Sequence, residues 1–164
     1  MKPVHLKKTP YSTEVNRLIE LGHQQLREAG FKITKKRTEI LSLFADNQRY
    51  LTALTIHKAL EEIYPTMSYN TTYRNLYDFV EIGLLESTEY QNEQLFRLSC
   101  QLGHDCHHHH HHFICVNCGK ALVLDACPLE EVHTDLSSVK VLSHRFEVFG
   151  LCEDCQLLPE SELQ

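Results

Sequence analysis

Two Cys-X-X-Cys pairs and a run of histidines constrain this chain more than any other feature of its sequence. Cys115 and Cys118 form the first pair, Cys152 and Cys155 form the second, and six consecutive histidines lead into the first pair. Neutral imidazole and thiolate are the side chains that bind zinc best. This density of ligands predicts a metal-binding protein whose fold brings the two cysteine pairs together.

Two such pairs supply four thiolates to one ion. A site of this kind is closed, with no open position, and is typical of structural rather than catalytic zinc. A thioredoxin-like redox pair is the alternative, but neither pair is expected to open a helix after a strand, as that motif requires. We therefore predict a structural zinc site whose ligands are Cys115, Cys118, Cys152 and Cys155.

The histidine run predicts further metal ligands. It lies in mid-chain, whereas affinity tags lie at termini, and it leads directly into the apolar segment 113–115. Alternate side chains of an extended backbone point to opposite faces. His110 and His112 are therefore expected to face one way, and His109 and His111 the other. One strand could in this way supply two separate metal sites.

The charge of the chain is divided unevenly along its length. Its 164 residues suffice for one ordinary core or two small ones, and the formal net charge is −6. Residues 1–85 carry twelve Lys/Arg against nine Asp/Glu, and residues 86–164 carry four against thirteen. This asymmetry predicts two domains with different partners. No secretory signal and no apolar run of about 20 residues is present, and we expect a cytoplasmic protein without a membrane partner.

Hydrophobic periodicity predicts four helices and then a hairpin in the first half of the chain. The helices are expected at about 12–29, 34–44, 52–64 and 68–82, and the strands at 84–90 and 94–98. Compact helices followed by a hairpin form the winged helix-turn-helix pattern, in which the helix 68–82 would enter the major groove of DNA. A small helical bundle with one polar face fits the same periodicity, so both alternatives remain open at this point.

The second half predicts short strands at 112–115, 121–124, 139–142 and 146–151, with one helix at 128–136. The fold class expected for the whole chain is therefore α+β, with an N-terminal winged helix and a small α/β domain that contains the four-cysteine zinc site. A zinc enzyme would need an open metal site and a general acid or base, and the sequence contains neither HExxH nor HxE…PCxxC. We expect no enzymatic activity.

Four segments resemble the ferric uptake regulator family of metal-dependent repressors: REAGFKITKKR, SYNTTYRNL, HHFICVNCGK and LCEDC. Within that family, FADNQRYLTA, EQLFRLSC and HRFEVFG are most similar to the zinc uptake regulators of Gram-positive bacteria. The resemblance covers about residues 13–156. It implies a homodimer in which a winged-helix domain (12–98) is joined to a metal-binding dimerisation domain (99–156), between a flexible lead (1–11) and a tail (157–164).

The same resemblance assigns further metal ligands by position. It places a regulatory zinc on Glu86, Cys100, His110 and His112, and a third site on His109, His111, Glu130 and His144. We therefore expect about two to three zinc ions per chain.

The ligand at position 100 has competitors. The segment between Cys100 and His110 is longer than expected of close relatives, so His104 or Cys106 remains an alternative to Cys100. Cys127 is expected to be a buried small hydrophobe.

The choice of metal follows from the ligand types. Iron and peroxide sensors in this family resemble one another in using a histidine just before the third helix, where this chain reads Gln-Arg-Tyr at 48–50. Cys100 offers a thiolate instead, and a site of one sulfur, two imidazoles and one carboxylate suits zinc. The expected function is a zinc-responsive repressor that binds a palindromic operator and controls zinc uptake genes. The alternatives are an iron- or peroxide-responsive regulator of the same family, and a zinc buffer or zinc-ribbon adaptor without DNA binding.

The resemblance also implies contacts with double-stranded DNA. It places Tyr73 and Arg74 at the major groove, Lys32 near the minor groove and Arg37 at a phosphate. A solvated charge run is the alternative for the basic segment 35–37.

Overall fold

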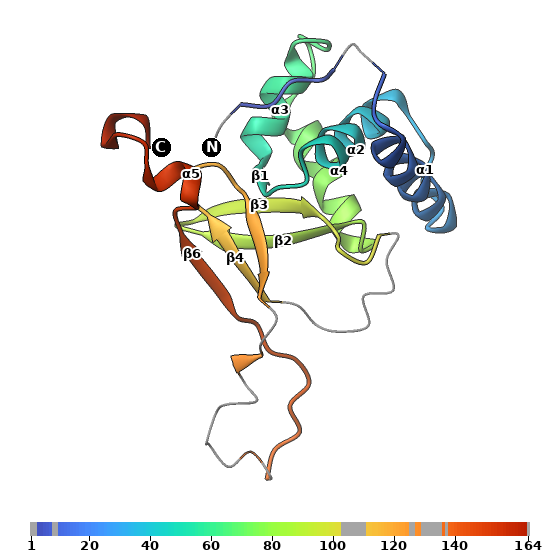
Figure 1. Ribbon diagram of the computed structural model, residues 1–164. Helices are drawn as coiled ribbons and strands as arrows, with labels where there is room; N and C mark the ends of the chain where they lie inside the picture. The colour runs from blue at the N-terminus through green and yellow to red at the C-terminus, as the bar shows by residue number, and fades with distance from the viewer. Residues whose placement is uncertain are drawn as a thin grey trace. The chain divides into compact units, whose positions relative to one another are not determined.

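The chain divides into two compact units, Met1–Cys106 and His107–Gln164. The computed structural model describes residues 3–7, 10–102, 111–124, 127–128, 136 and 138–163. The first unit combines helices with a small sheet, and the second is built on a sheet of its own (Figure 1). No helix within the described ranges is long and apolar enough to cross a membrane.

The helices of the first unit begin where the sequence predicts. Each follows a Ser or Thr whose hydroxyl oxygen accepts a hydrogen bond from the backbone N–H three residues further on, which satisfies one otherwise unpaired helical donor. Gly30 and Gly83 follow the first and last helix with φ of 78° and 73°, the left-handed conformation that ends a helix at little cost to glycine. The helices are α1 (Thr13–Glu28), α2 (Lys35–Asn47), α3 (Ala53–Glu61) and α4 (Tyr69–Glu81), and their capping residues are Ser12, Thr34, Thr52 and Ser68.

The predicted hairpin is present and belongs to a three-stranded antiparallel sheet. β2 (Leu85–Tyr90) pairs with β3 (Glu93–Leu98), and β1 (Leu51–Thr52) adds to the other side of β3. Gln91 and Asn92 form the turn with φ of 50° and 64°, which matches the right-handed twist of the strands. The sequence did not predict β1.

One hydrophobic core joins these helices to the sheet. Leu26 of α1, Ile40 and Phe44 of α2 and Phe96 of β3 are fully buried in it, so these elements share one apolar core. Val4, which lies in the expected flexible lead, is only 5% exposed and packs in the same core.

The second unit contains a mixed sheet with the order β5-β4-β6. β4 (His111–Cys115) is central; β5 (Ala121–Leu124) pairs with it antiparallel, and β6 (Glu147–Gly150) pairs with it in parallel. The short helix α5 (Glu153–Gln156) follows β6, and a 3-10 turn, η2 (Glu160–Glu162), lies in the expected tail.

One predicted strand of this unit is wrong. The segment 139–142 has strand-forming residues, but it forms no regular element, and Val139, Val141 and Leu142 are 58%, 48% and 84% exposed. Strand propensity depends on a partner, and this segment pairs with none of the three strands of the described sheet. The expected helix 128–136 lies almost entirely outside the described residues.

Candidate metal centres and DNA-contact surface

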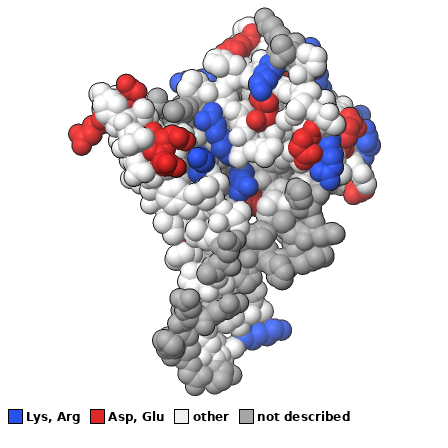
Figure 2. Space-filling view, in the orientation of Figure 1, with Lys and Arg blue, Asp and Glu red and all other residues white. Residues whose placement is uncertain are grey.

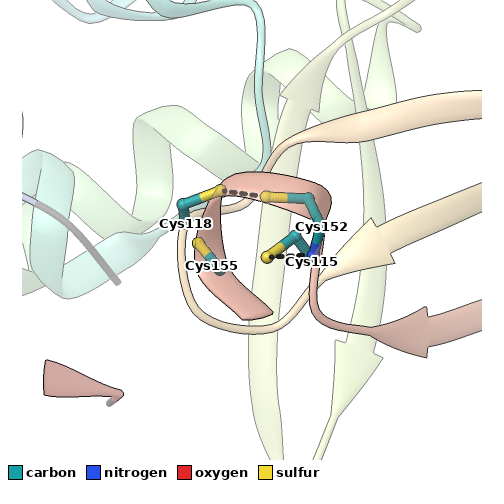
Figure 3. A group of neighbouring side chains, drawn as sticks. All are labelled: Cys115, Cys118, Cys152 and Cys155. Atoms are coloured by element: carbon teal, nitrogen blue, oxygen red, sulfur yellow. Dashed lines mark hydrogen bonds between the residues drawn. The ribbon is translucent and has the colours of Figure 1, made fainter. Parts of the chain in front are cut away.

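The four cysteines of the two pairs converge as predicted. Cys115 ends β4 and Cys118 lies in the turn after it, whereas Cys152 caps α5 and Cys155 lies within α5 (Figure 3). The second pair therefore opens a short helix after β6, so the expectation that neither pair would do so is wrong. Their sulfur atoms all lie within 4.8 Å of one another, and those of Cys118 and Cys152 are 3.6 Å apart. A disulfide would require about 2.05 Å, whereas two sulfurs on a tetrahedral zinc are about 3.8 Å apart when each Zn–S bond is about 2.3 Å. The cluster thus fits one zinc ion.

Two sulfur atoms of this cluster accept hydrogen bonds from N–H groups. The backbone N–H of Cys152 donates to the sulfur of Cys115 at 3.3 Å, and the side-chain N–H of Asn117 donates to the sulfur of Cys155 at 3.3 Å. Burial raises the pKa of Cys115, but the backbone N–H groups of Cys152, Cys118 and Asn117 outweigh it and lower that pKa to about 6. Burial raises the pKa of Cys118 to about 12 and also raises that of Cys155. Without a cation, Cys115 is therefore deprotonated more readily than Cys118 or Cys155.

A second group of metal-ligating atoms lies at the opposite end of β4. The Nε2 atoms of His111 and His144 are 3.3 Å apart, and the sulfur of Cys127 lies 3.4 Å from the first and 3.2 Å from the second. His111 is only 3% exposed. Of the set predicted for a third site, His111 and His144 are therefore brought together, whereas His109 and Glu130 lie outside the described residues.

The expectation that Cys127 is a small hydrophobe is wrong, because its sulfur contacts two imidazoles. The sequence alone does not reveal this contact, because it depends on the register of β5 with β4. Cys127 comes three residues after β5, and the last residue of β5, Leu124, pairs with His111 in the antiparallel ladder. A residue just beyond that pair returns close to the histidine strand.

The predicted regulatory ligands are divided between the two units. In the first unit Glu86 lies in β2 and Cys100 just after β3, and the Oε1 atom of Glu86 accepts a hydrogen bond from the backbone N–H of Cys100 at 2.8 Å. His112 lies in β4 of the second unit and is 5% exposed. His110 and the alternatives His104 and Cys106 lie outside the described residues. The side chains of adjacent residues in β4 point to opposite faces, so those of His111 and His112 lie in different surroundings.

Helix α4 presents a ladder of tyrosines beside its predicted DNA contacts. The rings of Tyr69, Tyr73 and Tyr77 follow one another at helical spacing, with centroids 5.8 Å and 4.8 Å apart. Tyr73 and Tyr77 share a hydrogen bond of 3.2 Å, and this bond, together with burial, raises the pKa of Tyr77. Arg74 is exposed on the same helix, and Lys32 is exposed ahead of α2. The ladder offers neutral hydroxyl groups and aromatic edges, both of which can contact DNA.

Arg37 makes contacts within the first unit that the sequence did not reveal. Its guanidinium donates to Asp78 at 2.9 Å, to Asn75 at 3.1 Å and to the carbonyl of Lys32 at 3.0 Å. It also lies over the ring of Phe31, 4.8 Å from its centre. These contacts tie α2 to α4, and they occupy donors that the family resemblance assigns to a DNA phosphate.

Charge is mixed on the surface in view. Among the described residues of the face shown in Figure 2, both Lys/Arg and Asp/Glu side chains are present. The small positive excess of residues 1–85 agrees with this mixture.

Comparison with known proteins identifies close relatives. Residues 28–149 match the ferric uptake regulator family. A ferric uptake regulation protein of Staphylococcus epidermidis is 44% identical over 131 residues, which cover 80% of this chain and 91% of the relative. The ferric uptake regulation protein of Staphylococcus aureus is 41% identical over 131 residues, with 80% and 93% covered.

Solved structures share the fold. A zinc uptake regulator complexed with zinc and DNA matches with a TM-score of 0.68 at 24% identity, over 88% of this chain and 97% of that chain. The ferric uptake regulator of Helicobacter pylori, described as having three functional metal-binding sites, matches with a TM-score of 0.61 at 20% identity, over 93% and 97%. These matches confirm the predicted α+β fold.

Proposed function

The chain belongs to the ferric uptake regulator family of metal-responsive, DNA-binding regulators of transcription, and we propose that it is a zinc-responsive repressor within that family. In this proposal a homodimer binds a palindromic operator when regulatory zinc is bound and represses zinc uptake genes. The structural zinc is held by the four cysteines that converge between β4 and α5.

The observation that carries the choice of zinc is the contact between Glu86 and Cys100. The backbone N–H of Cys100 donates to the carboxylate of Glu86, so the two residues are neighbours at the base of the hairpin formed by β2 and β3. A thiolate favours zinc over iron or manganese, which prefer nitrogen and oxygen ligands. The predicted partners in the second unit are His110 and His112.

Regulation would follow from ligands that belong to different units. Zinc, when bound, supplies a link between side chains of the winged helix and those of the second unit. To change the population of the DNA-binding arrangement usefully, zinc needs only about 100-fold higher affinity for that arrangement, or about 2.7 kcal/mol. The chain's own contribution is to hold Glu86 and Cys100 ready as neighbours.

Exposed apolar side chains on the second unit support the homodimer. Leu122 and Val123 of β5 are 49% and 46% exposed, and Val148 of β6 is 39% exposed. Leu122 and Val123 are adjacent in a strand, so they point to opposite faces, and neither face of the sheet is fully covered at this edge. A second copy would remove this surface from water.

Operator binding with different metals tests the proposal. We expect fluorescence anisotropy on an AT-rich palindrome to show tight binding with Zn²⁺ and weak binding without metal. Glu86→Gln and His112→Ala should each abolish the response to zinc while leaving the dimer intact. Glu89→Gln is the matched control, because Glu89 lies on the same strand and is exposed. A full zinc response in both Glu86→Gln and His112→Ala would contradict the assignment.

Iron is the second candidate for the regulatory metal. The Staphylococcus relatives at 44% and 41% identity are both ferric uptake regulation proteins, which favours iron. The same titration with Fe²⁺ under anaerobic conditions separates the two. If Fe²⁺ activates operator binding and Zn²⁺ does not, and if Cys100→Ser leaves the response unchanged, iron replaces zinc as the regulatory metal.

A further inference from the structure

The cluster of His111, Cys127 and His144 has the dimensions of a metal site. On a tetrahedral zinc with Zn–N bonds of about 2.05 Å and a Zn–S bond of about 2.3 Å, two nitrogens are about 3.35 Å apart and a nitrogen and a sulfur about 3.55 Å apart. The observed separations are 3.3 Å for the two nitrogens and 3.2 Å and 3.4 Å for nitrogen and sulfur. All three therefore match the edges of a coordination tetrahedron within about 0.4 Å.

Three segments distant in sequence bring these atoms together. His111 is the first residue of β4, Cys127 follows β5, and His144 precedes β6. Because β5 and β6 both pair with β4, the segments next to them bring Cys127 and His144 close to His111. The ring of Phe146 packs edge-on against His111 with centroids 5.7 Å apart, which gives the site an apolar wall. This ring contact limits the orientations open to the imidazole of His111.

We propose that Cys127 is a metal ligand and that, with His111 and His144, it forms a zinc site of two imidazoles and one thiolate. The sulfur distinguishes this site from the set of histidines and a glutamate expected from the family resemblance. A thiolate with two imidazoles selects zinc over magnesium, calcium and manganese, which prefer oxygen ligands. Three protein ligands leave a fourth position for water or another donor.

The expected effect of the ion is local. It would link the segments that contain Cys127 and His144 to the first residue of β4, at the end of the strand opposite the four-cysteine cluster. All three ligands belong to the His107–Gln164 unit, so the inference does not rest on the proposed operator binding.

Cobalt spectroscopy on the full chain tests the sulfur ligand directly. Cobalt bound to a thiolate gives a sulfur-to-cobalt charge-transfer band in the near ultraviolet, and cobalt bound to nitrogen and oxygen alone does not. The chain has seven cysteines, of which four belong to the structural cluster. With that cluster filled with zinc, and with Cys100 and Cys106 replaced by serine, Cys127 is the one thiol left to give the band.

We expect this background protein to show the band with Co²⁺ and to lose it when Cys127→Ser is added. Cys127→His is the second variant, because it restores a ligand; it should retain cobalt binding without the band. His144→Gln should weaken cobalt binding about 100-fold or more while Cys127 is still present, since even outer-shell changes cost 10- to 100-fold. His5→Gln, an exposed histidine in the other unit, should have no effect.

Absence of the band in the background protein, or its persistence after Cys127→Ser, would overturn the proposal. A His144→Gln variant that binds cobalt as tightly as its parent would do the same. Circular dichroism and a zinc count for the four-cysteine cluster establish that each variant is folded.

Discussion

Asn117 and the backbone N–H of Cys152 direct hydrogen bonds at sulfur atoms of the four-cysteine cluster, and these bonds matter because zinc binds thiolates. Each ligand still protonated must lose its proton when the metal binds. The pKa of Cys115 is lowered to about 6, whereas the pKa values of Cys118 and Cys155 are raised. Zinc binding to the metal-free protein at neutral pH should therefore release at least two protons.

The affinity of this cluster for zinc should fall on acidification, and should fall more steeply below about pH 6. Above that pH Cys115 is already a thiolate, and below it one more proton must be displaced for each ion bound. In a plot of the logarithm of the association constant against pH, the slope below pH 6 should therefore be greater by about one than the slope above pH 6. Competition with a chromophoric chelator between about pH 5 and pH 8 measures the slope. A slope that stays constant across pH 6 contradicts the lowered pKa.

Cys155→Ser should remove one tightly held zinc per chain and destabilise the His107–Gln164 unit by several kcal/mol. Structural zinc in small domains contributes about 10–16 kcal/mol of apparent binding free energy, most of which acts as folding free energy. Metal analysis after dialysis against a chelator, with thermal unfolding followed by circular dichroism, checks both. Lys140→Ala is the control, because Lys140 is exposed in the same unit and belongs to neither cluster. Retention of the zinc in Cys155→Ser would disprove a four-sulfur site.

Among helices and strands, the sequence predicted those whose signals are local. Helices begin near residues 12, 34 and 68 as expected, because the hydroxyl groups of Ser12, Thr34 and Ser68 reach an N–H three residues away without help from the rest of the fold. β1 was missed because two residues carry no periodicity, and it exists only through its pairing with β3. The failed strand 139–142 has the same cause, since its residues have strand propensity but pair with no strand of the described sheet.

Arg37 shows how an element is held by a contact that a charge pattern cannot reveal. Its guanidinium connects α2 to α4 through Asp78. A double-mutant cycle of Arg37→Ala and Asp78→Ala should give a coupling free energy of about 1 kcal/mol, because the pair is partly buried and hydrogen-bonded. Chemical denaturation measures it. Lys35→Ala, at an exposed neighbour, should change stability by less than about 0.5 kcal/mol.

The outcome of this cycle also bears on DNA binding. If the free energies of Arg37→Ala and Asp78→Ala simply add, the contact contributes no stability, and the phosphate role implied by the family resemblance gains support. Measurable coupling favours Arg37 as the residue that sets the position of α4.

At the scale of the whole molecule, each of the two units has its own chemistry, and the proposed function requires both. The predicted regulatory ligands come from both units, and the sequence could assign them only through family resemblance, since nothing local relates Glu86 to His112. Likewise, the convergence of Cys127 with His111 and His144 depends on the register of β4 with its two partners. Periodicity and spacing do not determine which distant segments of the chain come into contact.

Assembly can be tested on the exposed apolar side chains of the second sheet. Leu122→Asp and Val148→Asp should shift the protein from dimer to monomer, since a charge buried in an apolar interface costs several kcal/mol. Analytical ultracentrifugation reports the change. Leu157→Asp is the control, because Leu157 is 80% exposed and lies outside the sheet. A dimer that is unaffected by both sheet variants would place the interface elsewhere.

β4 contributes one ligand to each cluster of the second unit, His111 from its first residue and Cys115 from its last. Four residues of extended backbone separate their Cα atoms by roughly 13 Å and leave both side chains on the same side of the pleat. Deleting or inserting a single residue within the strand would turn one of the two ligands through half a revolution and away from its cluster. Loops on either side could change in length without that loss. The distance between the two clusters is therefore set by the number of residues that separate His111 from Cys115 in β4.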